Sequence, residues 1–210
     1  VSYLIGIEVA RRLNHAISPR HYVDGFHTTG TLNVFGAVAA SARLLNLDAP
    51  GTVNAIGIAA SRAAGVRRNF GTMPEILHPG FAAQDGIASA ELAARGLTAA
   101  SDALDGSTGF LGAGAGEFDA GEIVGRLSRP WLFDDPGVWI KPHPNGALTH
   151  PGAGCLLELL RDNSVVPAEI NEIRVQTNDR VWRTLQHHWP QTAMQAKFSM
   201  EFTLAVIAVG

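Results

Sequence analysis

The sequence predicts a mainly α fold with a smaller α+β insert. Apolar and small residues recur at helical spacing over most of residues 1–127. Two short runs, 138–140 and 170–177, instead have the composition or alternation of strands, and the helical pattern returns at residue 193. We therefore expect a helical domain over residues 1–134, an α+β domain over 135–192, and a return to the helical domain over 193–210.

The expected helices follow from apolar spacing and from Gly and Pro breakers. Residues 1–16 carry an apolar stripe, and a Ser-Pro pair ends it. Residues 31–46 and 48–65 are rich in alanine and glycine. Small side chains let helices approach closely, so we expect 31–46 to be buried among its neighbours. Breakers make residues 67–80 irregular, and the next helix is expected over 81–95.

The most unusual stretch is 140–151, which holds three prolines, two histidines and one of only two lysines. Proline fixes φ and removes a backbone donor, so this stretch forms a stiff loop. Thr149 and Pro151 predict the start of a helix over 152–161, whose free N–H groups attract carboxylates. Lys141 on this loop indicates an anion site. The alternative is a rigid structural turn with Lys141 in solvent.

Composition narrows the class of protein. The 210 residues carry a net charge of −3 and no basic tract, which argues against a nucleic-acid partner. A single cysteine, Cys155, and the lack of a visible signal peptide fit a cytoplasmic protein. The apolar run 202–210 is too short to span a membrane. Both ends fall in apolar helical patterns, so we expect a piece of a longer protein, a homo-oligomer such as a dimer, or a partner chain that supplies missing helices.

Familiar catalytic motifs are absent. The sequence has no zinc-type cysteine pattern, H-E-x-x-H, Walker loop or G-x-S-x-G, and its glycine run 109–116 lacks the dinucleotide-binding spacing. The neighbours His187 and His188 would diverge on a strand, which disfavours a metal pair. No metal and no organic cofactor is therefore expected. His27, in a Gly/Thr loop, could act as a general acid or base, or be a satisfied loop histidine.

Four loop segments stand between the helices: GFHTTGT at 25–31 with FGA at 35–37, GTM at 71–73 with LHPG at 77–80, KPHP at 141–144 with LTHP at 148–151, and FS at 198–199. Their order resembles the MmgE/PrpD family, which includes 2-methylcitrate dehydratase, cis-aconitate decarboxylase and iminodisuccinate epimerase. The resemblance covers essentially the whole chain. It implies a large helical domain with a smaller α+β lid and a cleft between them.

The resemblance also implies a chemistry. Enzymes of this family remove a proton beside a carboxylate of a small di- or tricarboxylate without an organic cofactor. His27 and Lys141 fall on active-site positions, as acid/base and as carboxylate or enolate ligand. Thr28, His78, Asn145 and His150 are expected to bind substrate, and His27, His78 and Lys141 to line the cleft.

Two departures from the family pattern bear on function. Glu75 stands where many members carry a lysine, which favours a smaller or less anionic substrate, or lost activity. From the resemblance we expect this chain to lack the family's N-terminal helical third and the region after Gly210. The leading hypothesis is a lyase or isomerase, with hydro-lyase as the expected reaction class and decarboxylation or epimerisation as variants. The alternative is a truncated, non-catalytic member that acts as a binding or assembly subunit.

Overall fold

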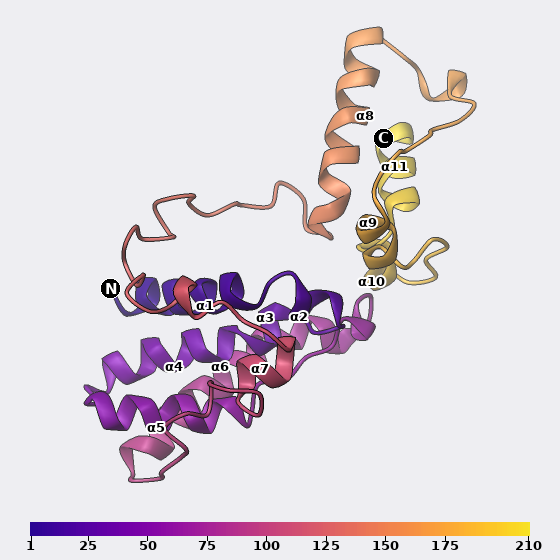
Figure 1. Ribbon diagram of the computed structural model, residues 1–210. Helices are drawn as coiled ribbons and strands as arrows, with labels where there is room; N and C mark the ends of the chain where they lie inside the picture. The colour runs from indigo at the N-terminus through magenta and orange to yellow at the C-terminus, as the bar shows by residue number, and fades with distance from the viewer. The chain divides into compact units, whose positions relative to one another are not determined.

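The computed structural model describes residues 1–210, and its regular structure is almost entirely helical (Figure 1). The mainly α fold class is thereby confirmed. The chain forms two compact units, one of Val1–Arg68 with Pro74–Val138 and one of Asn69–Met73 with Trp139–Gly210. The first contains α1 Ser2–Ile17, α2 Arg20–Val23, α3 Thr28–Thr31, α4 Asn33–Leu44, α5 Ala49–Ala60, α6 Met73–Ala94, α7 Phe110–Ala115 and the 3₁₀ turn η2 Ala120–Glu122. The 3₁₀ turn η1 Arg67–Asn69 lies where the two units meet in sequence.

The core of the first unit lies where α1, α4 and α5 pack together. Its largest fully buried apolar side chains include Ile17, Leu32 and Phe35. A methyl group on Gly6 would lie 2.6 Å from the carbonyl oxygen of Gly36, and one on Gly36 would lie 2.6 Å from that of Gly6. The two glycines therefore let the backbones of α1 and α4 come closer than any side chain would allow. The expected burial of the small-residue helix is confirmed.

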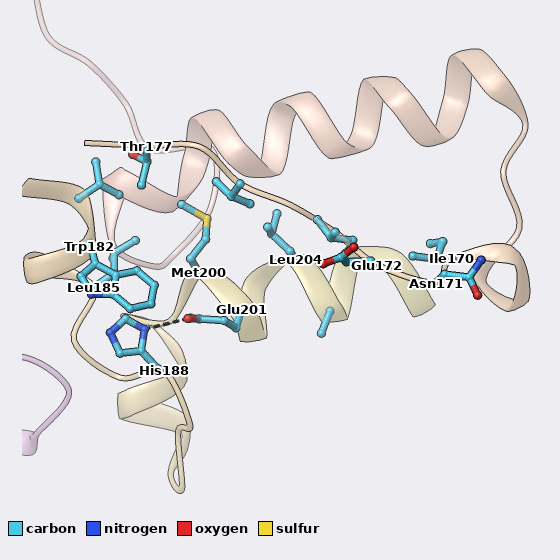
Figure 2. A pocket seen from close by; sticks show the side chains of 14 residues that line it. Ile170, Asn171, Glu172, Thr177, Trp182, Leu185, His188, Met200, Glu201 and Leu204 are labelled. Atoms are coloured by element: carbon cyan, nitrogen blue, oxygen red, sulfur yellow. Dashed lines mark hydrogen bonds and ion pairs between the residues drawn. The ribbon is translucent and has the colours of Figure 1, made fainter. Parts of the chain in front are cut away.

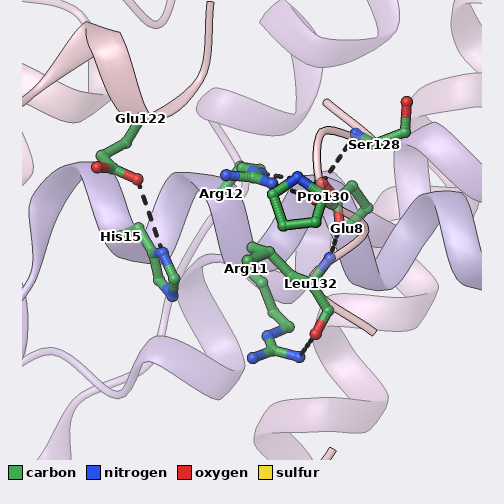
Figure 3. Close-up of polar contacts among 8 residues, drawn as sticks. All are labelled: Glu8, Arg11, Arg12, His15, Glu122, Ser128, Pro130 and Leu132. Carbon is green, nitrogen blue, oxygen red and sulfur yellow. Dashed lines mark hydrogen bonds and ion pairs between the residues drawn. The ribbon is translucent and has the colours of Figure 1, made fainter. Parts of the chain in front are cut away.

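A buried ion pair holds the segment after η2 against α1 (Figure 3). Arg12 Nε donates to Glu8 Oε1 at 2.9 Å, and both side chains are almost fully buried. The Glu8 carboxylate also accepts from the backbone N–H groups of Ser128, at 3.0 Å, and Leu132, at 2.8 Å, while Arg12 donates to the carbonyl of Pro130 at 2.6 Å. Burial by itself raises the pKa of Glu8, but these hydrogen bonds and the charge of Arg12 outweigh it, so the pKa lies below its ordinary value.

The second unit contains η3 Ala147–Thr149, α8 His150–Asn163, η4 Pro167–Glu169, α9 Asp179–Thr184, α10 Ala193–Ala196 and α11 Met200–Val209. A small apolar core joins α8 to α11, with Leu156 facing Leu204 and Ala208. Residues 193–210 thus pack within this unit. The three-part domain division 1–134, 135–192 and 193–210 stays a prediction.

The two predicted strands are wrong. Residues 138–140 and 170–177 contain no strand, and the α+β lid stays a prediction. The single β-type pairing is an isolated bridge between Phe26 and Val66. A strand needs a neighbour that accepts and donates its backbone hydrogen bonds, and no segment runs beside 170–177 in that way. Its alternating apolar residues, Ile173 and Val175 among them, instead line a cavity of about 480 Å³ whose wall includes Trp182, Leu204 and the hydrogen-bonded pair His188 and Glu201 (Figure 2).

Helix α6 begins earlier than the sequence predicts. It starts at Met73 and contains Pro79, whereas residues 67–80 were expected to be irregular. The missing N–H of Pro79 leaves the carbonyl of Glu75 without its helical partner. That carbonyl belongs to the first turn of the helix, and Pro79 itself is exposed, so water can replace the lost hydrogen bond. None of the helices in the structure has the length and apolar character that crossing a membrane requires.

Candidate functional site

Two histidines of the first unit face each other across a single hydrogen bond. His27 precedes α3 in extended conformation, and its N–H donates to the carbonyl of Gly65 at 3.0 Å. His78 lies in α6 and is 6% exposed, whereas His27 is half-buried. Their Nδ1 atoms are 2.8 Å apart, and their ring centroids are 5.0 Å apart. The structure thus joins two of the predicted site residues into one imidazole pair.

Two glycines make room for this pair. A methyl group on Gly30 would lie 2.5 Å from the carbonyl oxygen of Ala64 and 3.3 Å from Cβ of His78. Gly65 has a φ of +135°, a conformation that side chains disfavour, and lies beside the His78 ring. Glycine at position 30 therefore lets the His27 loop lie close to the backbone of Ala64, beside the His78 side chain.

The contact between the two Nδ1 atoms restricts the protons of the pair. One Nδ1 must carry hydrogen and donate, and the other must present its lone pair. If His27 donates, its Nε2 holds a lone pair and can accept a proton. If His78 donates, His27 carries hydrogen on Nε2 and can give one away. The two arrangements differ in which nitrogen of His27 carries hydrogen, so Nε2 of His27 is a base in the first and an acid in the second.

A second group of predicted site residues assembles on the 140–151 loop. Lys141 Nζ donates to the backbone oxygen of Asn145 at 3.2 Å, and the Asn145 side-chain oxygen lies 2.7 Å from His150 Nε2. The ring of His143 meets that of His150 edge-on at 5.6 Å. Burial lowers the pKa of His150, and the positive charges of His143 and Lys141 lower it further. An amide oxygen can only accept, so His150 donates Nε2–H to Asn145.

The start of α8 lies at the end of this loop, as the sequence predicts. Thr149 occupies the N-cap position, but its hydroxyl donates to the carbonyl of Gly146 at 2.9 Å and makes no cap. The first N–H groups of α8 keep their partial positive charge without a side-chain acceptor from Thr149. The loop thus places an ammonium group and a helix N-terminus close together in sequence.

A cavity of about 360 Å³ borders this loop, and sequence reasoning missed it. His143, Asn145 and Lys197 contribute its polar wall, and no acidic side chain lines it. Its apolar wall comes from α10 and α11, with Phe202 and Val206 among the contributors. The backbone of Lys197 anchors the loop by accepting from the N–H of Gly146 at 2.8 Å. The signal that could have found this wall is the second lysine, Lys197, which lies three residues before the apolar helix α11 begins at Met200.

The remaining candidates have separate positions. Thr28 is the first residue of α3, directly after His27, and is half-buried. His187 Nε2 contacts the carbonyl of Phe70 at 2.7 Å, while His188 Nδ1 contacts Glu201 at 2.8 Å, so these neighbours diverge and do not share a metal. His27, Thr28 and His78 belong to the first unit, and Lys141, Asn145 and His150 to the second. The predicted cleft shared by both groups stays a prediction.

Comparison with known families matches both units of the chain. Residues 1–122 match the MmgE/PrpD N-terminal domain, and residues 143–210 match the MmgE/PrpD C-terminal domain. No curated protein matches the chain.

Proposed function

This chain belongs to the MmgE/PrpD family, whose members are typically lyases or isomerases, and from that premise we propose that it removes a proton beside a carboxylate of a small di- or tricarboxylate. The proposed reaction class is a hydro-lyase similar to 2-methylcitrate dehydratase. Decarboxylation and epimerisation begin with the same kind of carbanion or enolate and are its variants.

The observation that carries the proposal is the contact between Nδ1 of His27 and Nδ1 of His78 at 2.8 Å. With His78 as acceptor, Nε2 of His27 is unprotonated and serves as the base. Once Nε2 has taken the substrate proton, the Nδ1 proton of His27 can pass to His78, and the positive charge moves with it. His78 is then a proton-relay partner, a more direct role than the substrate binding expected from the sequence.

The second group supplies the electrostatic part of the proposal. Removing a proton beside a carboxylate places negative charge on the carboxylate oxygens, so a nearby cation stabilises the transition state. Lys141 is exposed and tethered only through its contact with the backbone of Asn145, which leaves its ammonium available to an anion. Asn145, His150 and the hydroxyl of Thr28 are the proposed hydrogen-bonding groups for the substrate. The proposed step requires neither a metal nor an organic cofactor.

Glu75 adjusts the proposed substrate class. It lies three residues before His78 in α6, a spacing that puts both side chains on the same helix face. A carboxylate there repels a further substrate carboxylate. The site is therefore proposed to accept a dicarboxylate more readily than a tricarboxylate.

The test is proton–deuterium exchange in D₂O over a panel of di- and tricarboxylic acids, followed by NMR. Exchange is expected at a carbon next to a carboxylate, whatever product forms. His27→Gln should abolish it, and His15→Gln is the matched control, because His15 is a half-exposed histidine of α1 whose side chain contacts Glu122. Exchange that persists in His27→Gln, or a panel with no exchange in the wild-type chain, would contradict the proposal.

A further inference from the structure

His21 is a fully buried imidazole that the proposed reaction does not use. It is 0% exposed and hydrogen-bonded at both nitrogens, through Nδ1 to the carbonyl of Gly114 at 2.8 Å and through Nε2 to Oγ1 of Thr31 at 2.8 Å. Its ring stacks on Phe26, with centroids 4.4 Å apart and planes 1° apart. This one side chain thereby connects α2 to α3 and α7 and to the residue before His27.

The partners of His21 fix its tautomer. A carbonyl oxygen can only accept, so Nδ1 carries the hydrogen that binds Gly114. Burial lowers the pKa of His21, which favours the neutral ring with a single N–H. In that ring Nε2 accepts, and the hydroxyl of Thr31, 2.8 Å away, is its donor. Which nitrogen of His21 carries hydrogen is thus decided by the Gly114 carbonyl.

The same hydroxyl lies 3.3 Å from the carbonyl oxygen of His27. Thr31 has one hydroxyl hydrogen, which it donates to Nε2 of His21. The carbonyl of His27 therefore accepts its hydrogen bonds from the backbone N–H groups of Gly30, at 2.8 Å, and Thr31, at 3.1 Å. Those two bonds close the turn of α3. The orientation of the Thr31 side chain, at the end of this turn, is therefore set from His21.

His21 holds both sides of the segment that carries His27, because Phe26 precedes His27 and Thr31 ends α3. We propose that His21 is a positioning residue, which keeps Nδ1 of His27 directed at Nδ1 of His78 by fixing Phe26 and Thr31. Its effect on catalysis rests on the proposed function, whereas its effect on the imidazole pair does not. A histidine that merely filled the core would contribute to stability and leave the pair unchanged.

The experiment compares His21→Phe and Thr31→Val with Thr31→Ser in the full chain. His21→Phe keeps an aromatic ring on Phe26 and removes both hydrogen bonds, Thr31→Val removes only the hydroxyl, and Thr31→Ser retains it. The readout is ¹⁵N NMR of the His27 and His78 imidazoles, where wild type should give one protonated and one unprotonated Nδ1. His21→Phe and Thr31→Val should both lose this pattern and show freely exchanging tautomers, whereas Thr31→Ser should keep it.

Kinetics give the second readout. In proton–deuterium exchange, His21→Phe and Thr31→Val should each lower kcat roughly tenfold with KM within about twofold, since misplacing a catalytic group acts on the chemical step. The double variant should be no worse than the more affected single one, because both remove one link. Unchanged imidazole signals in folded Thr31→Val would overturn the inference. This test remains decisive if His21→Phe fails to fold. If wild type exchanges no proton, the proposed function fails, and the NMR comparison still decides the role of His21.

Discussion

At the scale of single residues, the structure brings two of the predicted site residues into direct contact. The sequence marks His27 and His78 separately, each as a histidine on a Gly/Pro-bounded loop. They lie 51 positions apart, and nothing in local periodicity predicts that their Nδ1 atoms meet at 2.8 Å. Lys141 and His150 could be grouped from sequence because one stiff loop carries both. Site residues from one segment are therefore easier to predict than a pair that only packing brings together.

Lys141→Ala should lower kcat about a hundredfold, since losing one group that stabilises developing charge typically costs about 3 kcal/mol. KM should change less, because the charge develops in the transition state. The melting temperature should hardly move, as Lys141 is exposed. The matched control is Arg174→Ala, which removes another exposed cation of the same unit. A kcat equal to wild type would show that Lys141 is a solvated loop residue, and a large loss of melting temperature would show a structural role.

Glu75→Lys should shift the preference towards substrates with more carboxylates. The change replaces a repelling charge by an attracting one on the face of α6 that carries His78. We expect kcat/KM for a tricarboxylate to rise about tenfold relative to a dicarboxylate, on the order of 1.4 kcal/mol. Competition between the two substrates in one NMR tube measures this ratio directly. An unchanged ratio would show that Glu75 does not face the bound substrate.

At the scale of elements, helices with strong spacing were predicted well and isolated strands were not. α1, α4, α5 and α8 form near their expected positions because their apolar stripes pack within their own unit. Residues 170–177 carry a strand pattern, but a strand forms only with a paired neighbour, and the alternation then serves a cavity wall. The sequence predicts Pro79 as a helix breaker, yet it lies inside α6, because the hydrogen bond that it removes falls in the first turn.

Gly36→Ala should destabilise the chain, because its methyl group would strike the backbone of α1 at 2.6 Å. We expect a loss of about 1–3 kcal/mol, the usual cost of overpacking a core. Gly80→Ala is the control: Gly80 is exposed within α6, a methyl group there meets no atom within 4 Å, and alanine is the better helix former by about 1 kcal/mol. Urea unfolding of both variants provides the comparison, and equal stability of Gly36→Ala and wild type would rule out the close crossing of α1 and α4.

Glu8 should make the free energy of unfolding depend on pH. Its pKa in the folded chain lies below the ordinary value of 4.5, so its ionised form favours folding. This contribution is complete above about pH 5.5, where the carboxyl is ionised in both states, and is lost as pH falls through the lowered pKa. Glu8→Gln should cost about 3–5 kcal/mol at neutral pH, because it leaves Arg12 buried without its counter-charge.

Urea midpoints measured between pH 7 and pH 3 test this assignment. Wild type should lose stability more steeply than Glu8→Gln as the medium is acidified, so that the two curves converge. Glu117→Gln serves as the control, since Glu117 is an exposed acid of the same unit. Parallel curves for wild type and Glu8→Gln would show that the packing of residues 128–132 against α1 does not depend on the charge of Glu8.

At the scale of the whole molecule, large apolar side chains remain in contact with solvent. Trp139 and Ile140 are 91% and 89% exposed, and Trp189 is 88% exposed. Such side chains commonly mark surfaces that another polypeptide covers. We therefore predict that the chain self-associates or binds a partner chain, as its sequence suggested. Sedimentation equilibrium at micromolar concentration tests this, with Trp139→Ser and Ile140→Ser combined to weaken association, and a monodisperse monomer for wild type would contradict it.

The central claim is that the His27 imidazole carries out the proton transfer, and chemical rescue tests it most directly. His27→Ala should exchange no α-proton of the substrate in D₂O, and adding free imidazole should restore exchange at a rate that rises with the concentration of unprotonated imidazole. His15→Ala should exchange at the wild-type rate and gain nothing from imidazole. Wild-type exchange by His27→Ala without imidazole, or a failure of imidazole to restore any exchange in the folded variant, would contradict the account.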